Sequence, residues 1–179
     1  MFDSMGCYVH IPFCVKKCAY CDFNSYSGYK DKTVQRYVCA LSCEIREAVP
    51  LSIPVDTIFF GGGTPTAIPA EDEAALLRAA RETLPLAEDA EITTEANPGT
   101  ADVRGLDILR RAGFNRISFG VQSFDSGLLK TLDRIHSAEE ARQAVSAARN
   151  AGFENISVDL MFGLPRQTLA QWRDTLAQA

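Results

Sequence analysis

Three cysteines lie close together near the start of the chain, in the run Cys14-Val15-Lys16-Lys17-Cys18-Ala19-Tyr20-Cys21. The C-x3-C-x2-C spacing puts three thiolates on one short loop, where they could bind three irons of a [4Fe–4S] cluster. The fourth iron would then have no protein ligand and could bind another molecule. The alternatives are free thiols or a zinc site completed by a distant residue. Closed zinc sites usually have four ligands, often from two C-x2-C pairs, and the sequence has no second pair.

A second group of candidate residues consists of polar side chains at or just after the ends of five apolar segments. They are His10, Thr64, Glu95, Gln122 and Asp159. In α/β sheets and barrels, ligands bind at the carboxyl ends of the parallel strands. Five such residues from five successive units therefore predict a binding site at that edge.

The elements that would position these residues alternate between strand and helix along the whole sequence. Strands are predicted over 7–11, 56–60, 91–96, 116–121 and 156–161. Helices are predicted over 32–49, between Pro69 and Pro85, from Thr100 to Gly113, from the Ser137–Glu140 capping box to Gly152, and from Thr168 to Ala179. This alternation predicts an α/β fold with a parallel sheet, either barrel or doubly wound. We expect one incomplete domain over 1–179 with about five βα units. A fifth strand with no strand beyond it would be an open edge, so we expect the chain to be truncated before a sixth strand.

The composition is that of a globular protein rather than a disordered, collagen-like or coiled-coil chain. Of 179 residues, 46% are hydrophobic and 23% are charged, with a formal net charge of −5. This mild acidity gives no basic face for nucleic acid. No apolar run reaches the roughly 18 residues of a membrane-spanning helix. The N-terminus has no features of an export signal, so we expect a cytoplasmic protein with reduced cysteines.

The cysteine loop resembles the signature of the radical S-adenosylmethionine (SAM) superfamily, in which an aromatic residue, here Tyr20, precedes the last cysteine. The resemblance implies a partial (β/α) barrel in which Cys14, Cys18 and Cys21 bind a [4Fe–4S] cluster. In that superfamily the open iron binds the amino and carboxylate groups of SAM. An electron from the cluster then breaks the sulfonium bond and gives a 5′-deoxyadenosyl radical.

Further motifs narrow the resemblance to one group of this superfamily. They are Tyr8–Cys14, Phe60–Thr66, Glu95–Gly99, Gly120–Phe124 and Asp159–Pro165. They resemble the oxygen-independent coproporphyrinogen III oxidase group, and residues 21–25 look like its HemW branch of haem chaperones. The resemblance implies haem binding and transfer in porphyrin metabolism. It also implies haem as a ligand of the complete protein, together with an unidentified haem acceptor and an unidentified electron donor.

The same resemblance implies a SAM site. Tyr8 and Tyr20 would contact SAM near the cluster, and the backbone around Gly62 and Gly63 would let its methionine end approach closely. The remaining implied SAM residues are Thr64, Glu95, Gln122, Arg134 and Asp159. By residue type alone, the glycines could form a flexible turn, the two acidic residues could be turn or cap residues, and the arginine could be a solvated charge. A bulky residue at either glycine is expected to block SAM and spare the cluster.

Position 23 separates the two functions that this group offers. The oxidases have a fourth cysteine two residues after the third, where this sequence has Phe23. Because phenylalanine cannot bind iron, the resemblance favours a haem chaperone. The alternatives are SAM-dependent radical decarboxylation of coproporphyrinogen III and a fragment that does neither. In any fold, Phe23 could also pack beside the loop.

Several other residues are expected to have ordinary roles. Cys39 and Cys43 share the outward face of the helix over 32–49, away from its apolar face, and Cys7 should be a small filler in a strand. His136, directly before a helix cap, is expected at the surface. Lys16 and Lys17 are either loop charges or groups that tune the cluster and guide the electron donor. The apolar face of that helix carries Val34, Tyr37, Val38, Leu41 and Ile45.

Overall fold

The computed structural model describes residues 4–48 and 53–179, and its centre is one open sheet of five parallel strands. The strands lie in the order β1-β2-β3-β4-β5. Their bounds are Met5–Ile11, Val55–Gly62, Leu86–Ala96, Arg116–Gln122 and Asn155–Leu160. Each of the first four strands is followed by helical structure that returns the chain to the start of the next strand, and α6 follows β5. The predicted α/β class and the partial barrel are therefore confirmed.

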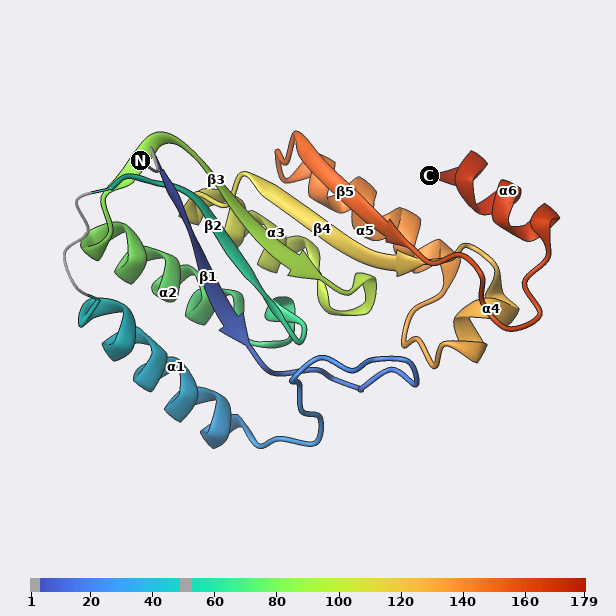
Figure 1. Cartoon of the computed structure of the whole chain (residues 1–179), viewed down its shortest axis with the longest axis horizontal. Coiled ribbons are helices and arrows are strands. Elements are labelled where there is room, and N and C mark those ends of the chain that lie inside the picture. Colours follow the sequence, from blue (N-terminus) through green and yellow to red (C-terminus); the bar gives the residue numbers. More distant parts are fainter. Residues whose placement is uncertain (1–3, 49–52) are drawn as a thin grey trace.

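Four helices cover the outer face of the sheet in a row (Figure 1). They are α1 (Asp31–Arg46), α2 (Ala70–Thr83), α3 (Val103–Ala112) and α5 (Ala138–Asn150). Two further helices, α4 (Ser126–Thr131) and α6 (Leu169–Gln178), follow β4 and β5 near the arrowheads of these strands (Figure 1). Short 3₁₀ turns at Pro65–Ala67 and Pro98–Thr100 precede α2 and α3.

The hydrophobic core lies between the sheet and this row of helices. Side chains of alternate strand residues, such as Ile58 and Phe60 in β2, are fully buried there. On α1, Val34 and Ile45 are buried and the other three residues of the predicted apolar face pack against the core. Burial of about 25 cal/mol per Å² of apolar area is the main term that holds helices and sheet together.

The opposite face of the sheet, which lines the concave side, is polar. Arg116 donates to the Thr93 hydroxyl at 3.3 Å and to the Ser157 hydroxyl at 2.9 Å. Ser157 in turn donates to Ser118 at 2.9 Å, and Ser118 donates to Asp159 at 3.2 Å. This network joins β3, β4 and β5 side by side and leads towards their carboxyl ends.

The helix ends follow local capping chemistry. Ser137 and Glu140 form the predicted capping box of α5, and Thr168 forms a second one with Gln171 at α6. Helix α3 begins later than predicted because residues 98–100 form a 3₁₀ turn, and Asp102 caps the helix by accepting from the Gly105 N–H. The short helix α4 was not predicted. Helix α1 ends at Arg46, and its predicted end at Val49 lies outside the described residues.

Strand β5 pairs only with β4 among the described residues, so it forms one edge of the sheet. This agrees with the sequence-based expectation for the fifth strand. In the described part of the chain, we find no helix with the length and apolar character needed to span a membrane.

The prediction that His136 lies at the surface was wrong. Its side chain is buried, with Nδ1 3.1 Å from Asn97 Oδ1 and Nε2 3.2 Å from the Val121 carbonyl oxygen. Burial, followed by the nearby positive charge of Arg134, lowers the pKa of His136 to about 4. A neutral imidazole can donate from only one of these nitrogens, and its buried ring packs the turn before α5 against the ends of β3 and β4.

A fully buried carboxyl group lies between α2 and β3. Glu73 has no exposed surface, and its Oε1 atom accepts a hydrogen bond from the Thr94 hydroxyl. Its Oε2 atom has no hydrogen-bond partner. Burial raises the pKa of Glu73 from 4.5 to about 8, so the group holds its proton at neutral pH.

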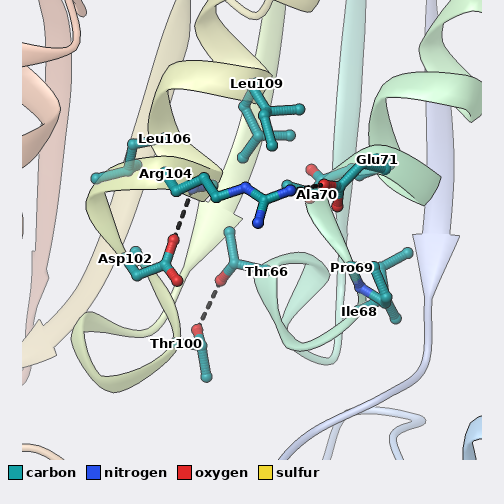
Figure 2. A pocket seen from close by; sticks show the side chains of 14 residues that line it. Thr66, Ile68, Pro69, Ala70, Glu71, Thr100, Asp102, Arg104, Leu106 and Leu109 are labelled. Carbon is teal, nitrogen blue, oxygen red and sulfur yellow. Dashed lines mark hydrogen bonds and ion pairs between the residues drawn. The ribbon is translucent and has the colours of Figure 1, made fainter.

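A cavity of about 260 Å³ lies beside this carboxyl group, between the N-terminal ends of α2 and α3 (Figure 2). The Thr66 and Thr100 hydroxyls are hydrogen-bonded at 2.7 Å on one side of it. Figure 2 shows Arg104 reaching across the cavity towards Glu71, to which it forms a 3.0 Å ion pair. No residue of the cysteine loop lines this cavity, which is therefore separate from the predicted cofactor site.

Candidate functional site

A second cavity, of about 280 Å³, lies at the carboxyl ends of the strands beside the cysteine loop. It brings together all of the predicted site residues except Tyr8 and His10, although they come from six separate segments. These residues are Cys14, Cys18, Tyr20, Cys21, Gly62, Gly63, Thr64, Glu95, Gln122, Arg134 and Asp159. The wall also contains residues that were not predicted as site residues, namely Lys16, Lys17, Phe23, Ala96, Asn97, Gly120 and Met161. Ala96, Asn97, Gly120 and Met161 belong to the motifs named above, so membership of a motif could have identified them as site residues.

The cysteine loop is fixed at both ends by backbone hydrogen bonds. The Cys14 N–H donates to the Tyr26 carbonyl at 2.9 Å, and the Tyr26 N–H donates to the Pro12 carbonyl at 2.7 Å. Within the loop, the Cys21 N–H donates to the Cys18 carbonyl at 3.1 Å. The ends of the loop are thus tied together before any ligand binds.

The donor set of this loop fits a [4Fe–4S] cluster. All three cysteines are free thiols on the wall of one cavity, and the Thr64 hydroxyl lies 3.6 Å from the Cys14 sulfur. Among residues 4–48 and 53–179, no group of three His, Cys, Asp or Glu side chains is close enough together to bind a single metal ion. A cluster does not need such a gathering, because each cysteine binds a different iron.

The glycines after β2 allow the backbone to pack tightly against β1 and the start of the cysteine loop. Gly62 has a φ of 111°, and a Cβ atom there would lie 2.4 Å from the His10 ring. A Cβ atom at Gly63 would lie 2.6 Å from the Phe13 carbonyl oxygen. These positions therefore need glycine for the fold as well as for any ligand.

This packing changes the expected result of substitution at Gly63. Because Phe13 directly precedes Cys14, Gly63→Ala should displace the cysteine loop and weaken cluster binding as well as SAM binding. We expect a loss of about 1–3 kcal/mol in the free energy of unfolding, together with a lower iron content after anaerobic reconstitution. Urea unfolding and iron analysis measure the two effects.

Gly99→Ala is the matched control for this experiment, because its Cβ atom would come closest to the flexible end of the Ile135 side chain, at 3.3 Å, and would meet Asn97 Oδ1 at an ordinary contact distance of 3.8 Å. It should cost less than about 1 kcal/mol. Wild-type stability and iron content in Gly63→Ala would contradict the steric argument.

Tyr8 and His10 point to the same side of β1, as the strand period predicts. The His10 Nε2 atom lies 2.9 Å from the Asn24 carbonyl oxygen, which can only accept a hydrogen bond. Nε2 therefore donates, and the Tyr8 hydroxyl donates to His10 Nδ1 at 3.0 Å. This chain of hydrogen bonds joins β1 to Asn24, which follows the cysteine loop. Tyr8 itself does not line the cavity.

Two carboxylates, Glu95 and Asp159, lie on the cavity wall together with the cations Lys16, Lys17 and Arg134. Glu95 is half-buried, and burial raises its pKa, while a hydrogen bond from the Gly62 N–H opposes this shift. The negative charge of Asp159 raises the pKa of Glu95 further, and Arg116 lowers it. Carboxylates so placed can accept hydrogen bonds from an amino group or from hydroxyl groups of a ligand.

Gln122 holds a strained backbone at the end of β4. Its φ of 68° lies in the left-handed region, where residues other than glycine are uncommon. The Gln122 carbonyl accepts from the Met161 N–H at 2.9 Å, which ties this residue to the end of β5. The Gln122 side chain lies on the cavity wall, where it can contact a ligand.

Two of the loop side chains have surroundings that the sequence did not reveal. Lys16 forms an ion pair with Asp133, and Lys17 donates to the Phe23 carbonyl at 3.0 Å. The idea that Phe23 packs beside the loop was wrong, because its side chain is 69% exposed. Cys39 and Cys43 are exposed on α1, as predicted.

The family model of the radical SAM superfamily matches residues 8–179, which is nearly the whole chain. The chain belongs to the radical SAM superfamily. The cavity and the cysteine loop lie at the carboxyl ends of the strands, the edge at which α/β barrels bind their ligands. The family's cofactors are SAM and a [4Fe–4S] cluster, in agreement with the donor set described above.

The radical SAM chain is similar to several curated proteins of this superfamily. It is 45% identical over 177 residues to the heme chaperone HemW of Escherichia coli (strain K12), covering 98% of this chain and 47% of that protein. It is 44% identical over 165 residues to the heme chaperone HemW of Bacillus subtilis (strain 168), covering 90% and 43%. An oxygen-independent coproporphyrinogen III oxidase of Synechocystis is 38% identical, with 96% and 38% covered. The chain thus spans about half the length of these relatives.

Solved structures agree with this assignment. The coproporphyrinogen III oxidase HemN from Escherichia coli, described as a radical SAM enzyme, superposes with a TM-score of 0.88 at 35% identity. The match covers 97% of this chain and 40% of that one. Methylornithine synthase has a TM-score of 0.63 at 16% identity, over 96% of this chain and 48% of that one, which shows a similar fold and no more.

Proposed function

We propose that the complete protein to which this chain belongs is a haem chaperone built on a radical SAM scaffold. It would bind haem and pass it to an acceptor protein, and it would carry a [4Fe–4S] cluster and SAM. The observation that carries the proposal is the end of the cysteine loop, where Phe23 follows Cys21 and Asp22. The similarity to HemW proteins at 40–45% identity supports it.

In this proposal, Cys14, Cys18 and Cys21 bind the cluster, which leaves one iron open for SAM. When bound, the cluster supplies that coordination site and one electron. The backbone at Gly62 and Gly63, with Thr64, would hold the methionine end of SAM. Tyr8 would also contact SAM, although it does not line the cavity. Five residues that do line the cavity would complete the SAM site. They are Tyr20, Glu95, Gln122, Arg134 and Asp159.

The position two residues after Cys21 argues against the oxidase alternative. The resemblance assigns the oxidases a cysteine there, whereas Phe23 has no group that binds iron or transfers a proton. Its ring is exposed at the cavity mouth, where it offers an apolar surface. Cys39 and Cys43 lie on the outward face of α1 and cannot replace the missing thiol. We further propose a separate electron donor and a cytoplasmic location.

The test uses the full-length protein, reconstituted with iron and sulfide without oxygen. Haem titration followed by visible absorbance should show saturable binding. An anaerobic assay with coproporphyrinogen III, SAM and a reduced cluster should show no turnover to protoporphyrinogen. Catalytic formation of protoporphyrinogen would overturn the chaperone proposal and favour the oxidase.

A further inference from the structure

The side chain of Arg134 connects three segments of the cavity wall. Its Nη1 atom lies 3.2 Å from the Cys18 sulfur and 3.5 Å from the Tyr20 hydroxyl oxygen. Its Nη2 atom donates to the Gly120 carbonyl at the end of β4. The Arg134 guanidinium thus joins the cysteine loop to β4, although Arg134 and Cys18 are 116 residues apart in sequence.

The positive charge of Arg134 has no carboxylate partner. None of the described Asp and Glu residues forms an ion pair with it within 4.0 Å, and its buried Nε atom makes no hydrogen bond. A half-buried cation without a counter-ion costs free energy. The Cys18 thiol, 3.2 Å from Nη1, is able to carry negative charge, so an anionic cluster bound there would offset this cost.

The backbone that carries Arg134 is held from two sides, which limits where the guanidinium can lie. Asp133 has a φ of 59° and forms the ion pair with Lys16 of the cysteine loop. The Arg134 N–H donates to the Leu129 carbonyl at 3.0 Å. His136 anchors the other end through Asn97 and Val121. The short Arg134–Cys18 distance is therefore set by a well-supported turn.

We infer that Arg134 donates an N–H···S hydrogen bond to the iron-bound Cys18 thiolate and thereby raises the reduction potential of the cluster. The inference rests on the proposed cluster, and it adds a role to the SAM contact that the family resemblance implies. Hydrogen bonds to cysteine sulfur withdraw electron density from the thiolate and stabilise the reduced, more negative cluster. A charged donor makes this bond stronger than a neutral one.

The test is a redox titration of the reconstituted full-length protein without SAM, followed by the EPR signal of the reduced cluster. Arg134→Lys keeps the charge and loses the planar fork, and Arg134→Gln loses the charge as well. We expect the midpoint potential to fall in the order wild type, Arg134→Lys, Arg134→Gln. Arg116→Lys and Arg116→Gln are matched controls, because Arg116 also joins neighbouring strands but contacts Thr93 and Ser157 instead of a thiol.

The outcomes separate this inference from the proposed function. A wild-type protein that takes up no cluster defeats both. A normal cluster whose potential is unchanged in both Arg134 variants, or lowered only in Arg134→Gln, overturns the hydrogen bond to sulfur. If Arg134→Gln retains no cluster, Arg134→Lys decides alone: a lowered potential supports the bond, and a wild-type potential overturns it. Equal shifts in the Arg116 controls also overturn it.

Discussion

Replacing Cys18 with serine should leave the protein unable to retain its iron–sulfur cluster. The wild-type protein should hold about four irons per chain after anaerobic reconstitution, as one [4Fe–4S] cluster requires. Cys18→Ser removes one of three thiolates from a loop whose two ends are fixed, so no neighbouring cysteine can take its place. Iron analysis and the visible absorbance of the cluster measure the loss, which we expect to be nearly complete.

Cys39→Ser and Cys43→Ser are the matched controls, since both thiols are exposed on α1 and remote from the loop. They should leave the iron content unchanged. Circular dichroism should show the same helix content in all three variants, because the loop contributes little to the hydrophobic core. A wild-type protein that holds zinc tightly and takes up no iron would contradict the cluster assignment.

The second large effect concerns the buried carboxyl group of Glu73. Below pH 4.5 the group is protonated in both the folded and the unfolded chain, so it does not oppose folding by ionising. Between pH 4.5 and about 8 the unfolded chain releases the proton while the folded chain holds it. The free energy of unfolding should therefore fall as the pH rises through this window. Above it, the loss is complete.

Glu73→Met should remove this pH dependence while filling much of the same volume. At pH 9 we expect the apo variant to be more stable than the wild type by about 2–4 kcal/mol. At pH 5 the advantage should shrink, because the protonated Glu73 still gains its hydrogen bond with Thr94. Urea unfolding followed by circular dichroism at the two pH values gives the difference.

Glu71→Gln serves as the control, because Glu71 is exposed and its ion pair with Arg104 is worth less than about 1 kcal/mol. It should change stability by a small amount that differs little between pH 5 and pH 9. Equal pH slopes for the wild type and Glu73→Met would show that Glu73 ionises without cost. In that case water or a rearranged side chain must reach its carboxyl group.

The sequence was most informative where one local pattern has one physical solution. Apolar runs predicted all five strands, and the residues at Ser137 and Thr168 predicted the starts of α5 and α6. The spacing of three cysteines predicted their common loop. Because the ends of parallel strands meet at one edge, Glu95, Gln122 and Asp159 could be placed in one cavity without knowledge of the tertiary contacts.

The sequence was least informative where burial depends on distant segments. His136 precedes a helix cap, a position that is usually solvated, yet Asn97 and Val121 enclose it. Glu73 lies in the first turn of α2, where acidic residues ordinarily face water and favour the helix dipole. No nearby residue reveals that β3 covers it. The Arg134–Cys18 contact is likewise invisible from residue types, because it depends on the shape of the turn before α5.

The contacts between the cysteine loop and the turn at residues 133 and 134 have a consequence for the order of events during synthesis. The three thiols leave the ribosome early, whereas the residues that hold Lys16, Cys18 and Tyr20 in place follow 114 to 117 positions later. At about 5–20 residues per second this interval lasts roughly 6–23 seconds. For that time the nascent loop has neither its arginine nor its ion pair. Cluster delivery before residues 133 and 134 have emerged would therefore meet three unsupported thiols that are open to oxidation.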